Sequence, residues 1–369
     1  MRNLSDTLTR LKRLRPMPAA WTPSKSRLQP FTAFGSNPGR LKSWIHVPDT
    51  VGPGAPLVIV LHGCTQNASG YDESSGWSRL ADRFGFIVLY PEQQRANSPN
   101  LCFNWFSPAN AARGQGEALS IRQMVTAVQT RHYTDANNVF VNGLSAGGAM
   151  AAVMLSTYPE VFAAGAVIAG LPFAVADTVP EAFDRMRGHG GPPPEALAEL
   201  VKNASAHTGP WPRLSVWHGS ADNTVDQLNA SALLNQWRPL HNVPAAPSEA
   251  DTVNGYPHRV WRDATGRAVI EEYSVTGLGH GTPLDVVGSD HGETAAPFML
   301  DASISSTRLI ASFWGIAPEQ TKARTRPAAA ASPTTFERSP PRAQAVALPQ
   351  QADIQRSIED ALRNAGLMK

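Results

Sequence analysis

Residues 138–154 read NVFVNGLSAGGAMAAVM, and this stretch decides the fold. An apolar, β-branched run over 138–141 predicts a strand, and a run of small residues over 148–154 predicts a helix. Between them lies Gly143-Leu144-Ser145-Ala146-Gly147, a G-x-S-x-G sequence. In this setting the pentapeptide forms a sharp strand-to-helix turn that exposes the serine hydroxyl at the helix N-terminus. The alternative is an ordinary glycine-rich turn, so the rest of the chain must distinguish the two.

The composition is that of a globular protein with ample material for a core. The chain has 369 residues, of which 42% are hydrophobic and 17% are charged, and its formal net charge is +2. These values fit one large domain with tails. Because basic and acidic residues nearly balance, there is no electrostatic footprint of a nucleic-acid binder, and we expect no nucleic-acid partner.

Apolar strands and helical patterns alternate along the middle of the chain. This alternation predicts an α/β fold with a mostly parallel central sheet and helices on both of its faces. The predicted strands cover 41–47, 57–61, 86–90, 138–141, 163–168, 213–217 and 269–273. The predicted helices cover 77–84, 117–133, 148–154, 228–237 and 305–314. Residues 171–212 are rich in Pro, Gly and Ala, and such a long excursion between strands predicts an insertion or lid over a functional site.

The two ends of the chain differ in composition from this central domain, which we place at 31–316. Residues 1–30 form a basic leader in which Leu4, Leu8, Leu11 and Leu14 fall on one helical face. Residues 317–348 are rich in Ala and Pro and predict a disordered linker, and 349–369 have the pattern of an amphipathic helix. The leader lacks the continuous apolar core of a signal peptide, and no stretch is long enough to span a bilayer. We therefore expect a cytoplasmic protein, with an extracellular or periplasmic location as the alternative.

A serine hydroxyl becomes a nucleophile only with a histidine to take its proton and an acid to hold that histidine. In α/β folds of this kind the chain order is serine, acid, histidine. Asp222 follows the strand over 213–217, and His280 follows the strand over 269–273 in a glycine-rich loop. Both therefore lie where open α/β sheets build their sites. Together with Ser145 they form the predicted triad.

Other residues compete for these roles. Asp226 is the rival acid, although it lies where a helix begins and a carboxylate stabilises the helix without catalysis. The alternative for Asp222 is a structural role as a turn residue without catalytic function. Of the ten histidines, His291 is the nearest rival of His280, whereas His62 and His218 sit in His-Gly turns and are expected to be structural or supporting.

The oxyanion of a tetrahedral intermediate needs backbone N–H donors. One comes from the residue after the nucleophile, here Ala146, and the other from the loop after an early strand. That loop is 61–67, LHGCTQN, so Cys64 or Thr65 supplies the second donor. The chain has two cysteines, Cys64 and Cys102, and they are either a pair of buried thiols or one disulfide bridge.

Several segments occur together in one order: LHGCTQN at 61–67, YPEQ at 90–93, CFNWF at 102–106, GLSAGGAM at 143–150, WHGSAD at 217–222 and GLGH at 277–280. In this respect the chain resembles the PHB depolymerase family of esterases, which is related to feruloyl and acetyl xylan esterases within the α/β-hydrolases. The resemblance covers about 41–314 and leaves both tails unexplained.

The resemblance implies an α/β-hydrolase fold and hydrolysis of carboxylic esters through an acyl-enzyme on Ser145, with His280 as base and Asp222 as its orienting acid. Poly(3-hydroxybutyrate) or its oligomers are the expected substrate, with feruloyl, acetyl or other short-chain esters as alternatives. Trp105 matches the family's aromatic segment near the cleft, either as a wall of the acyl site or as a core aromatic. We expect no metal or other cofactor. A different class of function is a granule- or surface-associated binding protein on a hydrolase scaffold.

Overall fold

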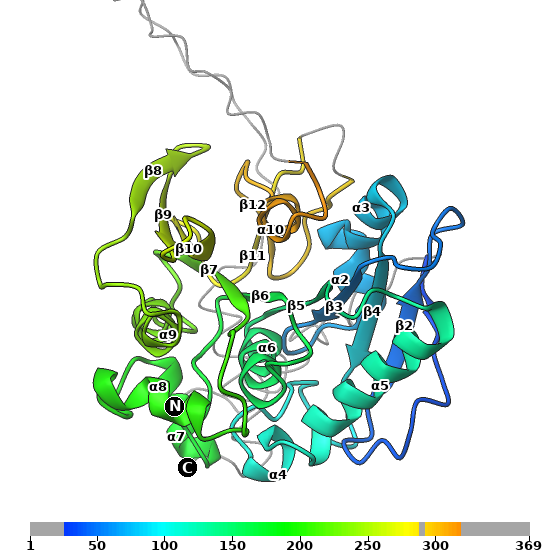
Figure 1. Cartoon of the computed structure of the whole chain (residues 1–369), viewed down its shortest axis with the longest axis horizontal. Coiled ribbons are helices and arrows are strands. Elements are labelled where there is room, and N and C mark those ends of the chain that lie inside the picture. The colour runs from blue at the N-terminus through cyan, green and yellow to red at the C-terminus, as the bar shows by residue number, and fades with distance from the viewer. Residues whose placement is uncertain (1–25, 288–291, 319–369) are drawn as a thin grey trace, which may run out of the picture. The chain divides into compact units, whose positions relative to one another are not determined.

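The computed structural model describes residues 26–287 and 292–318 (Figure 1). Most of the predicted leader, the linker, the C-terminal amphipathic helix and His291 lie outside the described residues. The division into leader, central domain, lid and tails therefore stays a prediction.

A mixed sheet forms the centre of the described part, with strand order β1-β2-β4-β3-β5-β6-β7-β10-β9-β8. The strands from β4 to β10 in this order are parallel to their neighbours, and the outer strands pair antiparallel. Their bounds are β1 (Gln29–Pro30), β2 (Lys42–His46), β3 (Leu57–Leu61), β4 (Ile87–Glu92), β5 (Val139–Leu144), β6 (Ala164–Ile168), β7 (Arg213–Gly219), β8 (Glu249–Val253), β9 (Tyr256–Arg262) and β10 (Ala268–Val275). A small parallel pair joins β11 (Thr282–Leu284) to β12 (Met299–Asp301).

Helices cover both faces of the sheet, as expected from the sequence (Figure 1). The face against α2, α3 and α10 and the face against α4 to α9 each carry their own apolar cluster. Strand β3 shows the division, because Leu57, Ile59 and Leu61 belong to one cluster and Val58 and Val60 to the other. Successive side chains of a strand point to opposite faces, so a strand buried on both sides reads as a continuous apolar run.

The helices are α2 (Ala68–Ser75), α3 (Trp77–Phe84), α4 (Pro108–Ala111), α5 (Gly116–His132), α6 (Ala146–Thr157), α7 (Val179–Met186), α8 (Pro194–Lys202), α9 (Leu228–Trp237), the short η1 (Pro239–His241) and α10 (Ser306–Trp314). The predicted helices over 77–84 and 228–237 have these same bounds. Residues 171–212 contain α7 and α8, and the buried Leu197, Ala198 and Val201 of α8 join the main core. Whether this segment acts as a lid remains a prediction.

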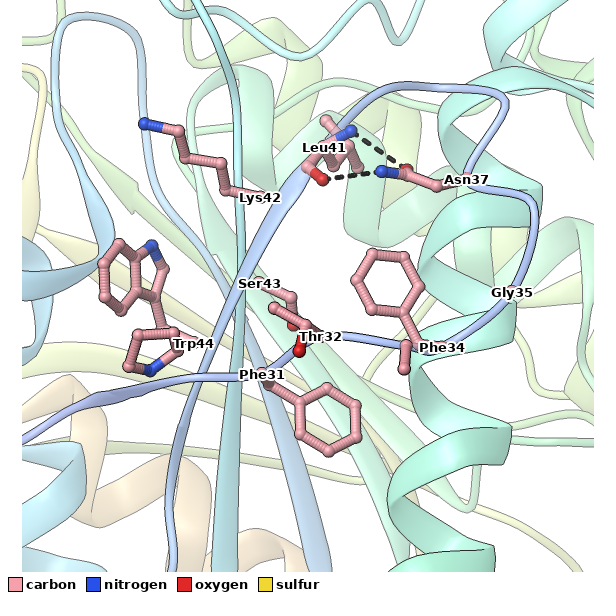
Figure 2. A pocket seen from close by; sticks show the side chains of 11 residues that line it. Phe31, Thr32, Phe34, Gly35, Asn37, Leu41, Lys42, Ser43 and Trp44 are labelled. Carbon is pink, nitrogen blue, oxygen red and sulfur yellow. Dashed lines mark hydrogen bonds between the residues drawn. The ribbon is translucent and has the colours of Figure 1, made fainter.

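A pocket lies at the β1–β2 edge of the sheet, beside Phe31, Phe34 and Ser43 (Figure 2). The loop that borders it is closed by Asn37, whose side chain both accepts from the Leu41 amide at 3.0 Å and donates to the Leu41 carbonyl at 2.8 Å. In the strand order, β4, β3, β5 and β6 lie between this edge and β7. The pocket is therefore remote from the loops that carry Asp222 and His280.

Candidate active site

Ser145 lies at the turn between β5 and α6 with φ 57° and ψ −119°. A left-handed φ is unusual for a residue with a Cβ and stores strain at this position. The neighbouring backbone holds the turn, because the Ser145 amide donates to the Ile168 carbonyl at 2.9 Å and its carbonyl accepts from the Ala149 amide at 2.8 Å. The turn has the strained geometry of a nucleophile elbow.

The glycines of the pentapeptide are required by close backbone approaches. A Cβ added at Gly143 would lie 2.3 Å from the Gly147 carbonyl oxygen, and one at Gly147 would lie 2.3 Å from the Leu61 carbonyl oxygen. Both oxygens belong to the backbone, so moving them away is more costly than moving the end of a flexible side chain. The second contact also shows that the start of α6 lies directly against the end of β3, where the predicted oxyanion loop begins.

Asp222 and His280 follow the adjacent parallel strands β7 and β10. The Nδ1 atom of His280 lies 2.7 Å from Oδ2 of Asp222, and both residues are buried. Since a carboxylate only accepts hydrogen bonds, the shared proton belongs to Nδ1, and Nε2 carries the free lone pair. The structure thus joins the predicted acid and base, and it places Ser145 at the carboxyl end of the same parallel sheet.

The surroundings of Asp222 favour its ionised form. Its Oδ1 accepts from the backbone amides of Thr224 at 2.8 Å and Val225 at 2.9 Å. Burial by itself would raise the pKa of Asp222, but the hydrogen bond and charge of His280, the Val225 amide and nearby His218 hold this pKa below its ordinary value. In the predicted triad, a negative Asp222 would stabilise an imidazolium at His280.

The rival residues have other partners. Asp226 accepts from the Leu228 amide at 2.8 Å, so it stabilises the start of α9. His218 Nε2 lies 2.8 Å from the Val225 carbonyl and 3.5 Å from Asp222 Oδ2, which places it behind the acid as a supporting group. Burial lowers the pKa of His218.

His62 is held in the core beside the oxyanion loop. Its Nε2 accepts from the Gln93 amide at 3.1 Å, so its proton is on Nδ1, which donates to the Gly63 carbonyl at 2.8 Å. Burial also lowers the pKa of His62, and this favours the neutral ring that these contacts require. The position agrees with the structural or supporting role expected for it.

The two alternatives for the second oxyanion donor are not equivalent. Thr65 donates its amide to the Asn100 carbonyl at 2.7 Å, which removes it as a donor to substrate. Over residues 26–287 and 292–318 we find no such partner for the amide of Cys64. Ala146 is the first residue of α6, so its amide has no acceptor within the helix. Of the two predicted alternatives these contacts favour Cys64, together with Ala146, and the assignment of both donors stays a prediction.

Cys64 and Cys102 form a disulfide bridge across a sequence separation of 38 residues. The bridge connects the oxyanion loop to the segment that carries Trp105. Trp105 has only 6% of its surface exposed and belongs to the main apolar cluster, with its ring edge-on to Phe106 at 5.6 Å. This burial favours the core alternative for Trp105, and its role as a wall of the acyl site stays a prediction.

Two residues near the site were not singled out from the sequence, although one of them, Gln66, lies in the quoted segment 61–67. Phe298 places its ring edge-on to His280, with centroids 6.0 Å apart, and Gln66 contacts the neighbouring Pro297. Both contacts join parts of the chain that are distant in sequence.

Across the described ranges, no group of three His, Cys, Asp or Glu side chains is arranged to hold a metal ion. The helices of the same ranges include none that is long and apolar enough to cross a membrane.

Comparison with known proteins shows which family this chain is related to. The family model "Esterase PHB depolymerase" matches residues 45–249. The chain is 43% identical over 319 residues to poly(3-hydroxyalkanoate) depolymerase C of Paucimonas lemoignei, covering 85% of this chain and 77% of that protein. It is 32% identical to feruloyl esterase B of Talaromyces stipitatus, covering 69% of this chain and 72% of that one.

A solved structure agrees with these relatives. The acetyl xylan esterase from Aspergillus awamori superposes with a TM-score of 0.63 at 30% identity, covering 69% of this chain and 93% of that one. The expected α/β-hydrolase fold is confirmed. The chain accordingly belongs to the PHB depolymerase family of esterases and is a carboxylic ester hydrolase.

Proposed function

We propose that Ser145 is the nucleophile of this esterase, with His280 as the general base and Asp222 as the acid that orients it. The single observation that carries this assignment is the 2.7 Å contact between His280 Nδ1 and Asp222 Oδ2. It leaves Nε2 of His280 as the atom that accepts the serine proton. The strained turn at Ser145 is a second, independent support.

The reaction follows from these atoms. As His280 Nε2 removes its proton, Ser145 Oγ attacks the ester carbonyl carbon, and the carbonyl oxygen becomes an oxyanion. The amides of Cys64 and Ala146 stabilise that charge. Collapse of the intermediate breaks the bond to the alcohol oxygen, which takes the proton from His280 and leaves an acyl-enzyme. Water then attacks the acyl carbon with the same base, and Ser145 is released with the carboxylic acid.

For the substrate we propose poly(3-hydroxybutyrate) or its oligomers. The support is the higher identity to a poly(3-hydroxyalkanoate) depolymerase, 43%, than to a feruloyl esterase, 32%. Feruloyl, acetyl or other short-chain esters are the alternative. Contact with the surface of a polymer granule is part of the same proposal.

The Cys64–Cys102 bridge bears on the compartment. Disulfides persist in oxidising compartments and are rare in the cytosol. The bridge therefore supports a periplasmic or extracellular location over the cytoplasmic one expected from the leader. A count of free thiols in protein taken from its native host tests this, because two free thiols would contradict it.

The proposal is tested with Ser145→Ala and, as a matched control, Ser231→Ala, which changes an exposed serine on α9. We expect Ser145→Ala to lose hydrolysis of p-nitrophenyl butyrate and labelling by a fluorophosphonate, with its melting temperature unchanged, and Ser231→Ala to keep both. Retained turnover in Ser145→Ala would contradict the assignment. Release of 3-hydroxybutyrate from polymer and oligomers, compared with release of ferulate and acetate from model esters, separates the proposed substrates.

A further inference from the structure

Gln66 connects two parts of the active site that are far apart in sequence. Its Oε1 accepts from the Gly63 amide at 2.8 Å, and its Nε2 donates to the Pro297 carbonyl at 3.2 Å. Gly63 lies in the oxyanion loop, whereas Pro297 lies 231 residues further along the chain from Gln66. The amide group of one side chain is therefore shared between the two segments.

The segment around Pro297 is packed against the loop of the catalytic base. The Phe298 carbonyl accepts from the Thr282 amide at 2.8 Å, and the Phe298 ring lies edge-on to His280 with centroids 6.0 Å apart. A Cβ added at Gly281 would come within 2.7 Å of the Phe298 oxygen, so this backbone approach is close. A displacement of Pro297 would consequently change the contacts that hold His280.

The other end of the connection fixes the proposed oxyanion donor. Gly63 has a backbone that adopts many conformations easily, so its orientation has to be set by its contacts. Its amide is held by Gln66, and its carbonyl is held by His62 Nδ1 at 2.8 Å. The Gly63 carbonyl and the Cys64 N–H belong to one planar peptide unit, so the His62 contact sets the direction of this N–H directly, and the Gln66 contact fixes the peptide unit before it.

We propose that Gln66 is a positioning residue that fixes the Cys64 amide relative to His280, so that the oxyanion donor and the base keep a productive spacing. This inference rests on the proposed function. The bond to Gly63 alone would make Gln66 a turn residue of the oxyanion loop. It is the bond to Pro297 that couples this loop to the base, and the two bonds can be separated by substitution.

Gln66→Glu separates them because it keeps the shape of the side chain. Its Oε1 still accepts from the Gly63 amide, but the other carboxylate oxygen faces the Pro297 carbonyl, and two acceptors repel each other. Gln66→Leu removes both bonds. Gln123→Leu is the matched control, since Gln123 Oε1 accepts from the Asn37 amide at 2.9 Å and its Nε2 donates to Ser36 Oγ at 2.9 Å, beside the remote β1–β2 edge.

The experiment measures kcat and KM for p-nitrophenyl butyrate and the melting temperature of all variants. We expect kcat to fall about 10- to 100-fold in Gln66→Glu, because a misplacement of about 1 Å costs up to that factor. KM should change much less, the melting temperature should hold, and Gln66→Leu should lose at least as much kcat. Gln123→Leu should keep the wild-type kcat.

An unchanged kcat in Gln66→Glu, or a loss matched by Gln123→Leu, would overturn the inference. So would a loss of kcat in Gln66→Glu that only accompanies a lower melting temperature. Wild-type protein without Ser145-dependent hydrolysis would instead contradict the proposed function. The two failures are therefore distinguishable in one set of measurements.

Discussion

Removal of the Cys64–Cys102 bridge tests how much the oxyanion loop contributes to stability. The bridge closes a loop with a sequence separation of 38 residues. A crosslink across that many residues lowers the entropy of the unfolded chain by about 13 cal/mol/K, which is about 4 kcal/mol at 25 °C. This is a large share of the roughly 5–15 kcal/mol by which folded proteins are stable. We expect Cys64→Ser/Cys102→Ser to be destabilised by about this amount.

The assay is thermal and denaturant unfolding of the wild type and the double variant, each with and without a reducing agent. For a domain of this size, about 4 kcal/mol corresponds to a melting temperature lower by roughly 6 °C. The double variant is its own control, because the reducing agent should leave its unfolding unchanged. Titration of free thiols confirms that the wild-type sample is oxidised.

The same samples report on catalysis. Loss of the bridge loosens the loop that presents the Cys64 amide. At temperatures well below the melting temperature, kcat should therefore be lower than in the wild type, by up to the roughly 100-fold that loss of one oxyanion donor costs. A destabilisation below about 1 kcal/mol would refute the entropic reasoning. An unchanged kcat would refute the role given to the Cys64 loop.

Three further predictions concern the triad, a buried acid and the elbow. Asp222→Asn should lower kcat by about 10⁴-fold in steady-state kinetics, with little change in melting temperature, because the asparagine stabilises the wrong tautomer of His280. A loss of kcat below tenfold would argue against the role of Asp222 as the orienting acid. Burial raises the pKa of Glu293 from 4.5 to about 8. Its contribution to stability is therefore fully present below about pH 4.5 and is lost as pH rises toward 8, at up to about 1.4 kcal/mol per pH unit, because the unfolded chain ionises first. Glu293→Gln should thus unfold at a higher temperature than the wild type at pH 8 and at the same temperature at pH 4.5, and equal curves at both pH values would contradict the shift. Gly147→Ala should be destabilised by about 2 kcal/mol or more, seen in urea unfolding, since its Cβ would lie 2.3 Å from the Leu61 carbonyl oxygen; wild-type stability there would mean that the helix start can move.

The parts of the fold that follow from local pattern were predictable. The run over 57–61 is apolar at every position because β3 is buried on both faces, and this alone identifies a central parallel strand. By contrast, the hairpin of β8 and β9 was not predicted. Most of β8 is exposed, so its sequence carries no alternating pattern of buried residues.

The site shows the same division between local and long-range information. Ser145, Asp222 and His280 each follow a strand, and their chain order is enough to propose them together. The choice between Cys64 and Thr65 depends on Asn100, which takes the Thr65 amide, and no pattern in the loop itself reveals this. Gln66 depends in the same way on Pro297. Contacts between distant segments depend on the three-dimensional fold, so local patterns in a single sequence do not predict them.

The backbone conformation at Ser145 lowers the stability of the fold at the position that the proposed catalysis requires. With φ at 57°, the turn has a conformation that glycine adopts easily and serine adopts at a cost of about 1 kcal/mol or more. Ser145→Gly would therefore remove the proposed nucleophile and at the same time relieve the backbone strain, so this variant should be inactive and should melt at a higher temperature than the wild type. Selection for thermal stability alone would remove this serine. Its presence at a strained position therefore supports the proposed role of Ser145 as the nucleophile.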